Sequence, residues 1–160
     1  MKLIFAAATG VRASEPHALR WRHIDFDRRE VRIETRVDPH GIEDVPKTKA
    51  GLRSIPLGES VLAALLTWRR VTRFAGKNDL VFPNTLGSYD NHTDMVKRKF
   101  LPLFAKLAAI WEQERCNEPL EVFTWHALRH ITNSCWIEAG LPVCRAQTAD
   151  TYCLPVMGDV

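Results

Sequence analysis

The stretch Phe123–His130, Phe-Thr-Trp-His-Ala-Leu-Arg-His, predicts the first turns of a helix that brings two imidazoles and one guanidinium together. Thr124 is placed to cap this helix, because a threonine hydroxyl accepts a hydrogen bond from a backbone N–H of the first turn. His126 and Arg129 lie three residues apart and therefore project side by side. The positive end of a helix, an imidazole and a fork of N–H donors together favour an oxyanion such as phosphate.

The same residues have a second interpretation, in which they serve no common site. His126 and His130 are also compatible with two hydrogen-bonded surface histidines, and Arg129 with an ion pair to a distant carboxylate. A zinc site is disfavoured, because no nearby cysteine or acidic residue completes a familiar ligand set with the His-x3-His pair. Features elsewhere in the sequence distinguish the two interpretations.

The composition is that of a globular protein. The chain has 160 residues, of which 46% are hydrophobic and 26% charged, so we expect one domain. Its net charge of +3 is compatible with a polyanionic partner. The basic residues form three groups, which together predict a nucleic-acid footprint. These groups are Arg20, Arg22, Arg28, Arg29, Arg32 and Arg36; Arg69, Arg70 and Arg73; and Lys97, Arg98 and Lys99.

The cysteines and the N-terminus indicate a cytoplasmic protein. None of the four cysteines forms a C-x2-C pair, and no signal peptide precedes them, so we expect reduced thiols. The apolar run Leu3–Ala8 is too short to span a membrane. We therefore expect no membrane contact.

The first quarter of the chain predicts two helices joined by a short link. Residues 2–9 have the pattern of the end of a buried helix, and Gly10 is placed to terminate it. Ser14 is a suitable cap for a second helix, with Glu15 in its first turn. Arg12 then lies in the link, where Glu15 is close enough to brace it.

A three-stranded antiparallel meander is predicted next. Apolar and charged residues alternate from Glu30 to Val37, as in a half-buried strand. A second strand runs up to Lys47, the segment Lys47–Gly51 forms a hairpin tip, and Leu52–Leu57 is the third strand.

The remainder of the chain predicts helices. An amphipathic helix spans 59–74, and a longer one spans about 93–114 with a bend at Pro102. The residues expected to point inward from the longer helix are Met95, Phe100, Phe104, Leu107 and Ile110. In the helix that begins at Thr124, the expected buried stripe is Leu128, Ile131 and Cys135.

Four motifs now stand in order along the chain. They are Ala8-Thr9-Gly10-Val11-Arg12-x-x-Glu15, Leu19-Arg20-Trp21-x-x-Ile24-Asp25, Lys47-Thr48-Lys49 ahead of Arg53-Ser54-Ile55-Pro56-Leu57, and His126-x-Leu128-Arg129-His130. Over roughly residues 3–143 the sequence resembles the catalytic domain of tyrosine recombinases, the phage-integrase family of DNA breaking and rejoining enzymes. This resemblance implies an α+β fold, a mostly helical core with a small three-stranded antiparallel sheet. It also implies site-specific DNA recombination or integration on double-stranded DNA.

The resemblance assigns a role to each residue of the phosphate site. Arg12 and Arg129 resemble the two arginines that clamp the scissile phosphate, His126 the histidine that shares it, and Glu15 the acidic residue that supports Arg12. The hairpin lysine that protonates the leaving 5′-oxygen is Lys47, with Lys49 as the competing assignment. The family's chemistry implies no metal, no cofactor and no small-molecule substrate, and it leaves room for self-association on DNA.

The C-terminal sequence departs from the family pattern. The family continues to a Leu-Gly-His element and then to the nucleophilic tyrosine, whereas here Met157–Asp159 is at best a shifted trace with Asp159 in place of the histidine. Tyr152 precedes that trace, and Tyr89 lies in a mid-chain loop. The nucleophile is therefore expected to be missing.

These departures set the expected domain organisation and activity. Residues 1–143 form the catalytic-domain-like region, and 144–160 form a divergent, poorly ordered tail. The expected protein is an inactive recombinase fragment, truncated at both ends. The alternative is a non-catalytic basic DNA-binding protein.

Overall fold

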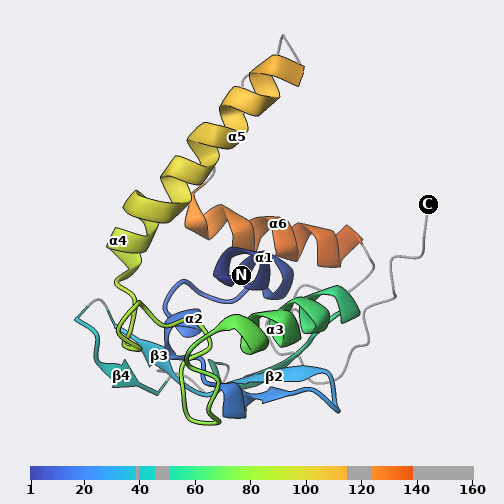
Figure 1. The fold of residues 1–160 in the computed structure, drawn as a ribbon. Coiled ribbons are helices and arrows are strands. Elements are labelled where there is room, and N and C mark those ends of the chain that lie inside the picture. Colours follow the sequence, from blue (N-terminus) through green and yellow to red (C-terminus); the bar gives the residue numbers. More distant parts are fainter. Residues whose placement is uncertain (39, 46–50, 115–123, 139–160) are drawn as a thin grey trace.

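The computed structural model describes residues 1–38, 40–45, 51–114 and 124–138. Its helices and strands, in chain order, are α1 (Lys2–Thr9), α2 (Glu15–Ala18), η1 (Trp21–His23), β1 (Ile24–Asp25), β2 (Glu30–Ile33), β3 (Arg36–Val37), β4 (Glu43–Asp44), β5 (Arg53–Pro56), α3 (Glu59–Val71), α4 (His92–Met95), η3 (Val96–Phe100), α5 (Leu101–Glu114) and α6 (Trp125–Glu138). Helix α1 packs against both α6 and α3, and the small sheet lies beyond α3 (Figure 1). Within these ranges, no helix is both long and apolar enough to cross a lipid bilayer.

A three-stranded antiparallel sheet is present, but its strands differ from the predicted meander. Its order is β1-β2-β5, with Val31 of β2 opposite Ile55 of β5. The predicted strand 30–37 divides into β2 and β3, and β3 pairs with β4 in a separate ribbon. The chain leaves the first sheet because Val37 N–H donates to the Ser14 carbonyl at 3.1 Å, which ties β3 to the start of α2.

The inner face of the sheet and helix α3 share one apolar core. Val31, Ile55 and Leu65 of α3 are each at most 2% exposed. The indole N–H of Trp68 donates to the Val81 carbonyl at 2.7 Å. This bond satisfies a polar group at the edge of the core and joins α3 to the segment that contains Val81.

Helix α1 ends as predicted. Gly10 adopts the left-handed conformation with φ of 59°, and its N–H donates to the Ala6 carbonyl at 3.0 Å. Glycine adopts this conformation without the clash that a Cβ atom would cause. The buried Thr9 hydroxyl donates to the Phe5 carbonyl at 2.6 Å. The link that holds Arg12 therefore starts from a rigid point.

The predicted long helix contains an irregular turn. Between α4 and α5, η3 is a π-helical turn in which Leu101 N–H donates to the Val96 carbonyl, five residues back. This wider turn ends two residues before Pro102, whose ring would clash with a carbonyl in a regular helix and which lacks an N–H. The irregularity thus begins before the predicted bend.

Helix α5 also buries less than predicted. Met95 and Phe100 are buried, but Leu107 is 43% and Ile110 50% exposed, so the prediction was wrong for these two residues. Beyond its first turns α5 extends away from α1, α3 and α6 (Figure 1).

Candidate functional site

Helix α6 buries a different face from the one predicted. Its buried residues are Trp125, Thr132 and Trp136. Two of the three predicted positions, Ile131 and Cys135, are exposed. The reason is tertiary: the Thr132 hydroxyl donates to the Ala7 carbonyl of α1, so this small polar residue occupies the contact between the two helices. Arg129, one turn before Thr132, is thereby directed toward α1.

Arg129 contacts the end of α1 directly. Its Nη1 donates to the Gly10 carbonyl oxygen, which joins positions that are 119 residues apart in the chain. Gly10 is suited to this contact for a second reason besides its φ, because an added Cβ would lie 3.3 Å from the Thr132 methyl carbon. The glycine thus allows α6 to approach closely enough for Arg129 to reach the link between α1 and α2.

Glu15 is the centre of the polar cluster in this link. Its side chain is 2% exposed and accepts hydrogen bonds from two arginines. Arg12 donates its backbone N–H at 2.7 Å and its Nη1 at 3.2 Å. Arg53, at the start of β5, donates Nη1 and Nη2 to the two carboxylate oxygens at 2.9 and 2.8 Å. Such a two-pronged pair fixes both partners in orientation as well as in position.

The charge of Glu15 is maintained by these partners. Burial acts to raise the pKa of the Glu15 carboxyl, but the hydrogen bonds and charge of Arg53, together with the bonds from Arg12, outweigh it and leave the pKa below its ordinary value. Glu15 is therefore ionised at neutral pH.

Arg129 belongs to the same electrostatic cluster. Burial lowers the pKa of Arg129, the charges of Arg12 and Arg53 lower it further, and Glu15 opposes them. An arginine nevertheless stays protonated at neutral pH. The guanidinium groups of Arg12 and Arg53 bond to the Glu15 carboxylate, and that of Arg129 interacts with it electrostatically, which gives these four side chains a net charge of +2. Arg12 keeps 53% of its side chain exposed, so part of this charge faces solvent.

His126 lies in the first turn of α6, which begins as predicted. Ala127 N–H donates to the Thr124 hydroxyl at 3.3 Å, the capping bond expected from the sequence. The ring of His126 is exposed and meets the ring of His130 edge to face, with centroids 4.6 Å apart. Among the described residues, no three His, Cys, Asp or Glu side chains gather into a group that could hold a metal ion.

Several residues singled out in the sequence lie outside the described residues. They are Lys47, Lys49, Tyr152 and Asp159. Tyr89 is described: its hydroxyl accepts from Arg20 at 3.0 Å and donates to Glu43. Burial and the Glu43 carboxylate raise the pKa of Tyr89. Tyr89 is therefore a neutral hydrogen-bonding group in the structure.

Arg53 is the residue of the cluster that the sequence interpretation missed. The signal was present, because Arg53, Ile55 and Leu57 alternate along one face of the predicted third strand. Ile55 and Leu57 are buried, so a charged side chain on their face needs a carboxylate partner. Only the fold shows that this partner is Glu15.

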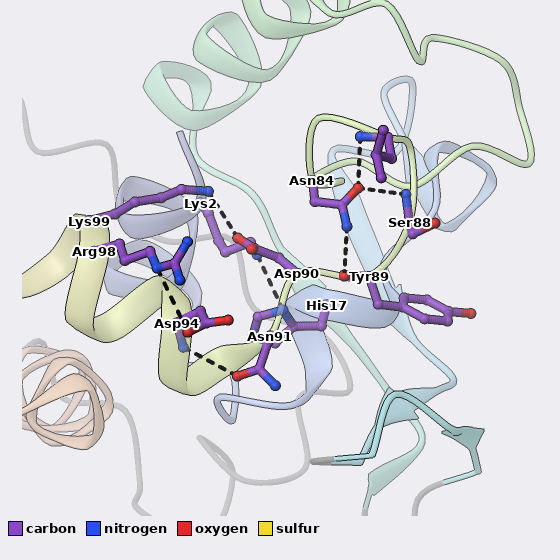
Figure 2. Close-up of polar contacts among 11 residues, drawn as sticks. Lys2, His17, Asn84, Ser88, Tyr89, Asp90, Asn91, Asp94, Arg98 and Lys99 are labelled. Atoms are coloured by element: carbon purple, nitrogen blue, oxygen red, sulfur yellow. Dashed lines mark hydrogen bonds and ion pairs between the residues drawn. The ribbon is translucent and has the colours of Figure 1, made fainter.

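A second charged cluster surrounds Asp90, near the N-terminal end of α1 (Figure 2). Its Oδ2 accepts from Lys2 at 3.4 Å and from Lys99 at 3.1 Å. Burial lowers the pKa of Lys2 to about 8, against the opposing charge of Asp90. Burial and the Lys2 charge lower the pKa of His17 to about 3. Its neutral ring therefore accepts from Lys2 at 3.2 Å. Lys2, Asp90 and Lys99 also line a mainly apolar cavity of about 300 Å³.

Comparison with known proteins places the chain in a family. A model of the phage integrase family matches residues 2–149. The chain belongs to this family. A tyrosine recombinase XerC-like protein from Caldanaerobacter subterraneus subsp. tengcongensis is 29% identical over 163 residues, which cover 88% of this chain and 39% of that protein. This integrase-family chain therefore spans about two fifths of the length of that relative.

Solved structures of similar fold include a transposon integrase and a recombinase. The Tn1549 transposon integrase in complex with a circular intermediate DNA has a TM-score of 0.71 at 21% identity, covering 91% of this chain and 48% of that one. XerA recombinase has a TM-score of 0.58 at 14% identity, covering 92% and 46%. The predicted fold class, a mostly helical α+β core with a small three-stranded antiparallel sheet, is confirmed.

Proposed function

We propose that this chain binds and activates a DNA phosphodiester for site-specific recombination or integration, using Arg12, Lys47, His126 and Arg129. Similar proteins support a DNA partner, since the Tn1549 integrase structures contain circular intermediate DNA and transposon right end DNA. We assign this role to residues 1–143, the region that carries the four motifs.

The observation that carries the proposal is the excess of positive charge around Glu15. Three guanidinium groups come from separate segments, Arg12 from the link after α1, Arg53 from β5 and Arg129 from α6. A carboxylate neutralises only one of them. A structural ion pair would need no such surplus, whereas a dianionic or developing negative charge on a phosphate would balance it.

The proposed chemistry follows from the charges that develop when a phosphodiester is attacked. Arg12 and Arg129 would neutralise the nonbridging oxygens, and His126 at the positive end of α6 would share that charge. Lys47 would protonate the leaving 5′-oxygen, because an alkoxide is a poor leaving group. Lys49 is the competing candidate for this acid.

We further propose that this chain binds DNA without cleaving it. Neither of its two tyrosines follows a Leu-Gly-His element, and the Tyr89 hydroxyl is held by Glu43 and Arg20. Incubation with a nicked or suicide DNA substrate is expected to give no covalent adduct on a denaturing gel. A denaturation-resistant band that disappears in Tyr152→Phe would contradict this.

DNA binding at several salt concentrations tests the phosphate site itself. The double variant Arg12→Gln, Arg129→Gln should bind DNA more weakly. The slope of log K against log salt concentration should also decrease by about 1.8, since each lost phosphate contact removes about 0.9. The control is Lys106→Gln, which removes a charge from an exposed side chain of α5 that belongs to none of the three basic groups. Equal binding by the double variant and wild type would favour the alternative, a basic surface without a phosphate site.

A further inference from the structure

Arg53 occupies an unusual place for an arginine. Its side chain is 6% exposed, and in the sheet it stands opposite Ile33, which is 2% exposed. Burying a charge in such surroundings is costly unless it is paired in good geometry. The fork of Arg53 on both oxygens of Glu15 meets that condition.

The same side chain also bonds to Gly51, the residue that follows the segment of the candidate lysines in the sequence. Arg53 Nη1 donates to the Gly51 carbonyl at 3.3 Å, and Gly51 directly follows residues 46–50. Arg53 therefore bonds both to the carboxylate that supports Arg12 and to the chain that leads out of the lysine segment.

We propose that Arg53 is a positioning residue that keeps the charge of Arg12 available to phosphate. This inference rests on the proposed function. Without Arg53, the Glu15 carboxylate would have Arg12 as its only cationic hydrogen-bonding partner among the described residues. It would then draw the exposed guanidinium of Arg12 into a full ion pair. When Arg53 is present, its charge balances that of the Glu15 carboxylate. Glu15 then orients Arg12 without balancing the charge of Arg12.

The charge balance of the cluster makes this proposal testable by rescue. Arg53→Gln lowers the net charge of the four side chains from +2 to +1. The Glu15 carboxylate then pairs with Arg12. The double variant Glu15→Gln, Arg53→Gln restores +2 and frees Arg12 again. If Arg53 instead contacted DNA itself, removing Glu15 as well would not restore what the lost guanidinium supplied.

The experiment measures the affinity of the 160-residue chain for a fluorescently labelled DNA duplex. We expect Arg53→Gln to bind about fivefold more weakly than wild type, and the double variant to return to within about twofold of it. The matched control is Lys106→Gln, which removes one charge from an exposed side chain of α5 that belongs to none of the three basic groups. This control should bind DNA as wild type does.

Each outcome has a distinct meaning. If Arg53→Gln does not fold, the double variant, which buries no unpaired charge, still tests the inference by its affinity. A double variant that binds about fivefold more weakly than wild type overturns the positioning role. So does unchanged binding by Arg53→Gln while Arg12→Gln weakens it. If Arg12→Gln and Arg129→Gln also bind as wild type does, the proposed function fails, and this inference with it.

Discussion

Glu15 and Asp90 are two carboxylates with two basic partners each, and the partners differ in kind. Glu15, 2% exposed, is held by guanidinium groups, and Arg53 reaches both of its oxygens at 2.8–2.9 Å. Asp90, 14% exposed, receives two ammonium groups on a single oxygen, at 3.1 Å from Lys99 and 3.4 Å from Lys2. A guanidinium presents fixed, planar donors, whereas an ammonium is a compact point charge that loses its proton more easily.

The basic partners of Glu15 carry a charge that does not change with pH, whereas one partner of Asp90 carries a charge that does. A guanidinium group in a protein keeps its charge throughout the physiological pH range. The pKa of Lys2, lowered to about 8 by burial, allows the charge beside Asp90 to change near neutral pH. A charge that does not change with pH suits the proposed phosphate site better than one that does. The Asp90 cluster instead fastens α1 to the segment before α4 (Figure 2).

The largest expected effect tests whether Glu15 neutralises a buried charge. Glu15→Gln leaves Arg53 buried without a carboxylate and should lower the free energy of unfolding by about 3–5 kcal/mol. Asp90→Asn should cost only about 1–2 kcal/mol, because Lys2 can lose its proton and Lys99 is 65% exposed. Urea unfolding at pH 7 measures both. Adding Arg53→Gln to Glu15→Gln should recover more than half of the loss, and equal losses for the two single variants would refute the contrast.

The second effect concerns pH. The pKa of His17 is about 3 in the folded protein against an ordinary value of 6.5, so between these values the unfolded chain binds the extra proton. Stability should therefore be complete above pH 6.5 and fall as the pH decreases, by about 2 kcal/mol between pH 7 and pH 5 from His17 alone. Urea unfolding at these two pH values should show a smaller difference in His17→Gln.

Between pH 7 and pH 5, the change in the free energy of unfolding should come from the Asp90 cluster and not from the Glu15 cluster. The pKa values of Glu15 and Asp90 are both lowered, so these carboxyls stay ionised in the folded protein above pH 5. The pKa values of His92 and His23 are also lowered, so some pH dependence should remain in His17→Gln. A variant that keeps the full wild-type difference would show that His17 is not responsible.

The third effect tests how far the guanidinium cluster depends on the backbone at Gly10. Gly10→Ala should cost about 1.5 kcal/mol, because it imposes a left-handed φ on alanine and crowds the Thr132 methyl group. Gly41→Ala is the control, since its φ is 82° but an added Cβ meets nothing within 4 Å. Thermal unfolding of the two variants should differ, and DNA binding should weaken only in Gly10→Ala. Equal results would leave no role for the contact with α6.

The smallest effect is expected at the exposed end of the Asp90 cluster. Lys99→Ala should change the free energy of unfolding by less than about 0.5 kcal/mol, because an exposed ion pair contributes little. Arg98→Ala, which removes a 3.8 Å pair with Asp94 on the same surface, is the reference. A loss above about 1 kcal/mol at Lys99 alone would show that Asp90 relies on both lysines.

Local sequence signals predicted many of the elements that position the site. Gly10 ends α1, Thr124 caps α6, and Arg12 lies in the link between two helices, as the residue types and their spacing indicated. Such features depend on backbone conformation and on hydrogen bonds within a few residues, so the sequence alone suffices to predict them.

Contacts between distant segments were predicted less well. The local pattern assigns the buried stripe of α6 to Leu128, Ile131 and Cys135, yet Ile131 and Cys135 are exposed. Thr132 is buried instead, because its hydroxyl bonds to α1 and Gly10 leaves space for it. The strand expected at 30–37 divides because Val37 bonds to Ser14. In each case a hydrogen bond to a distant segment overrode the local hydrophobic pattern.

The sequence by itself determined which arginine, histidine and lysine residues this phage integrase family member offers to a site. It also determined the order of the motifs that contain them. Only the tertiary structure decided which charges meet. In the sequence Arg53 is one residue of a predicted strand, and only the position of β5 shows that its guanidinium bonds to Glu15. The contact of Arg129 with Gly10 likewise depends on the packing of α6 against α1. The physical reason is that side-chain identity is local, whereas the energy of a buried charge depends on partners that the chain brings together only by folding.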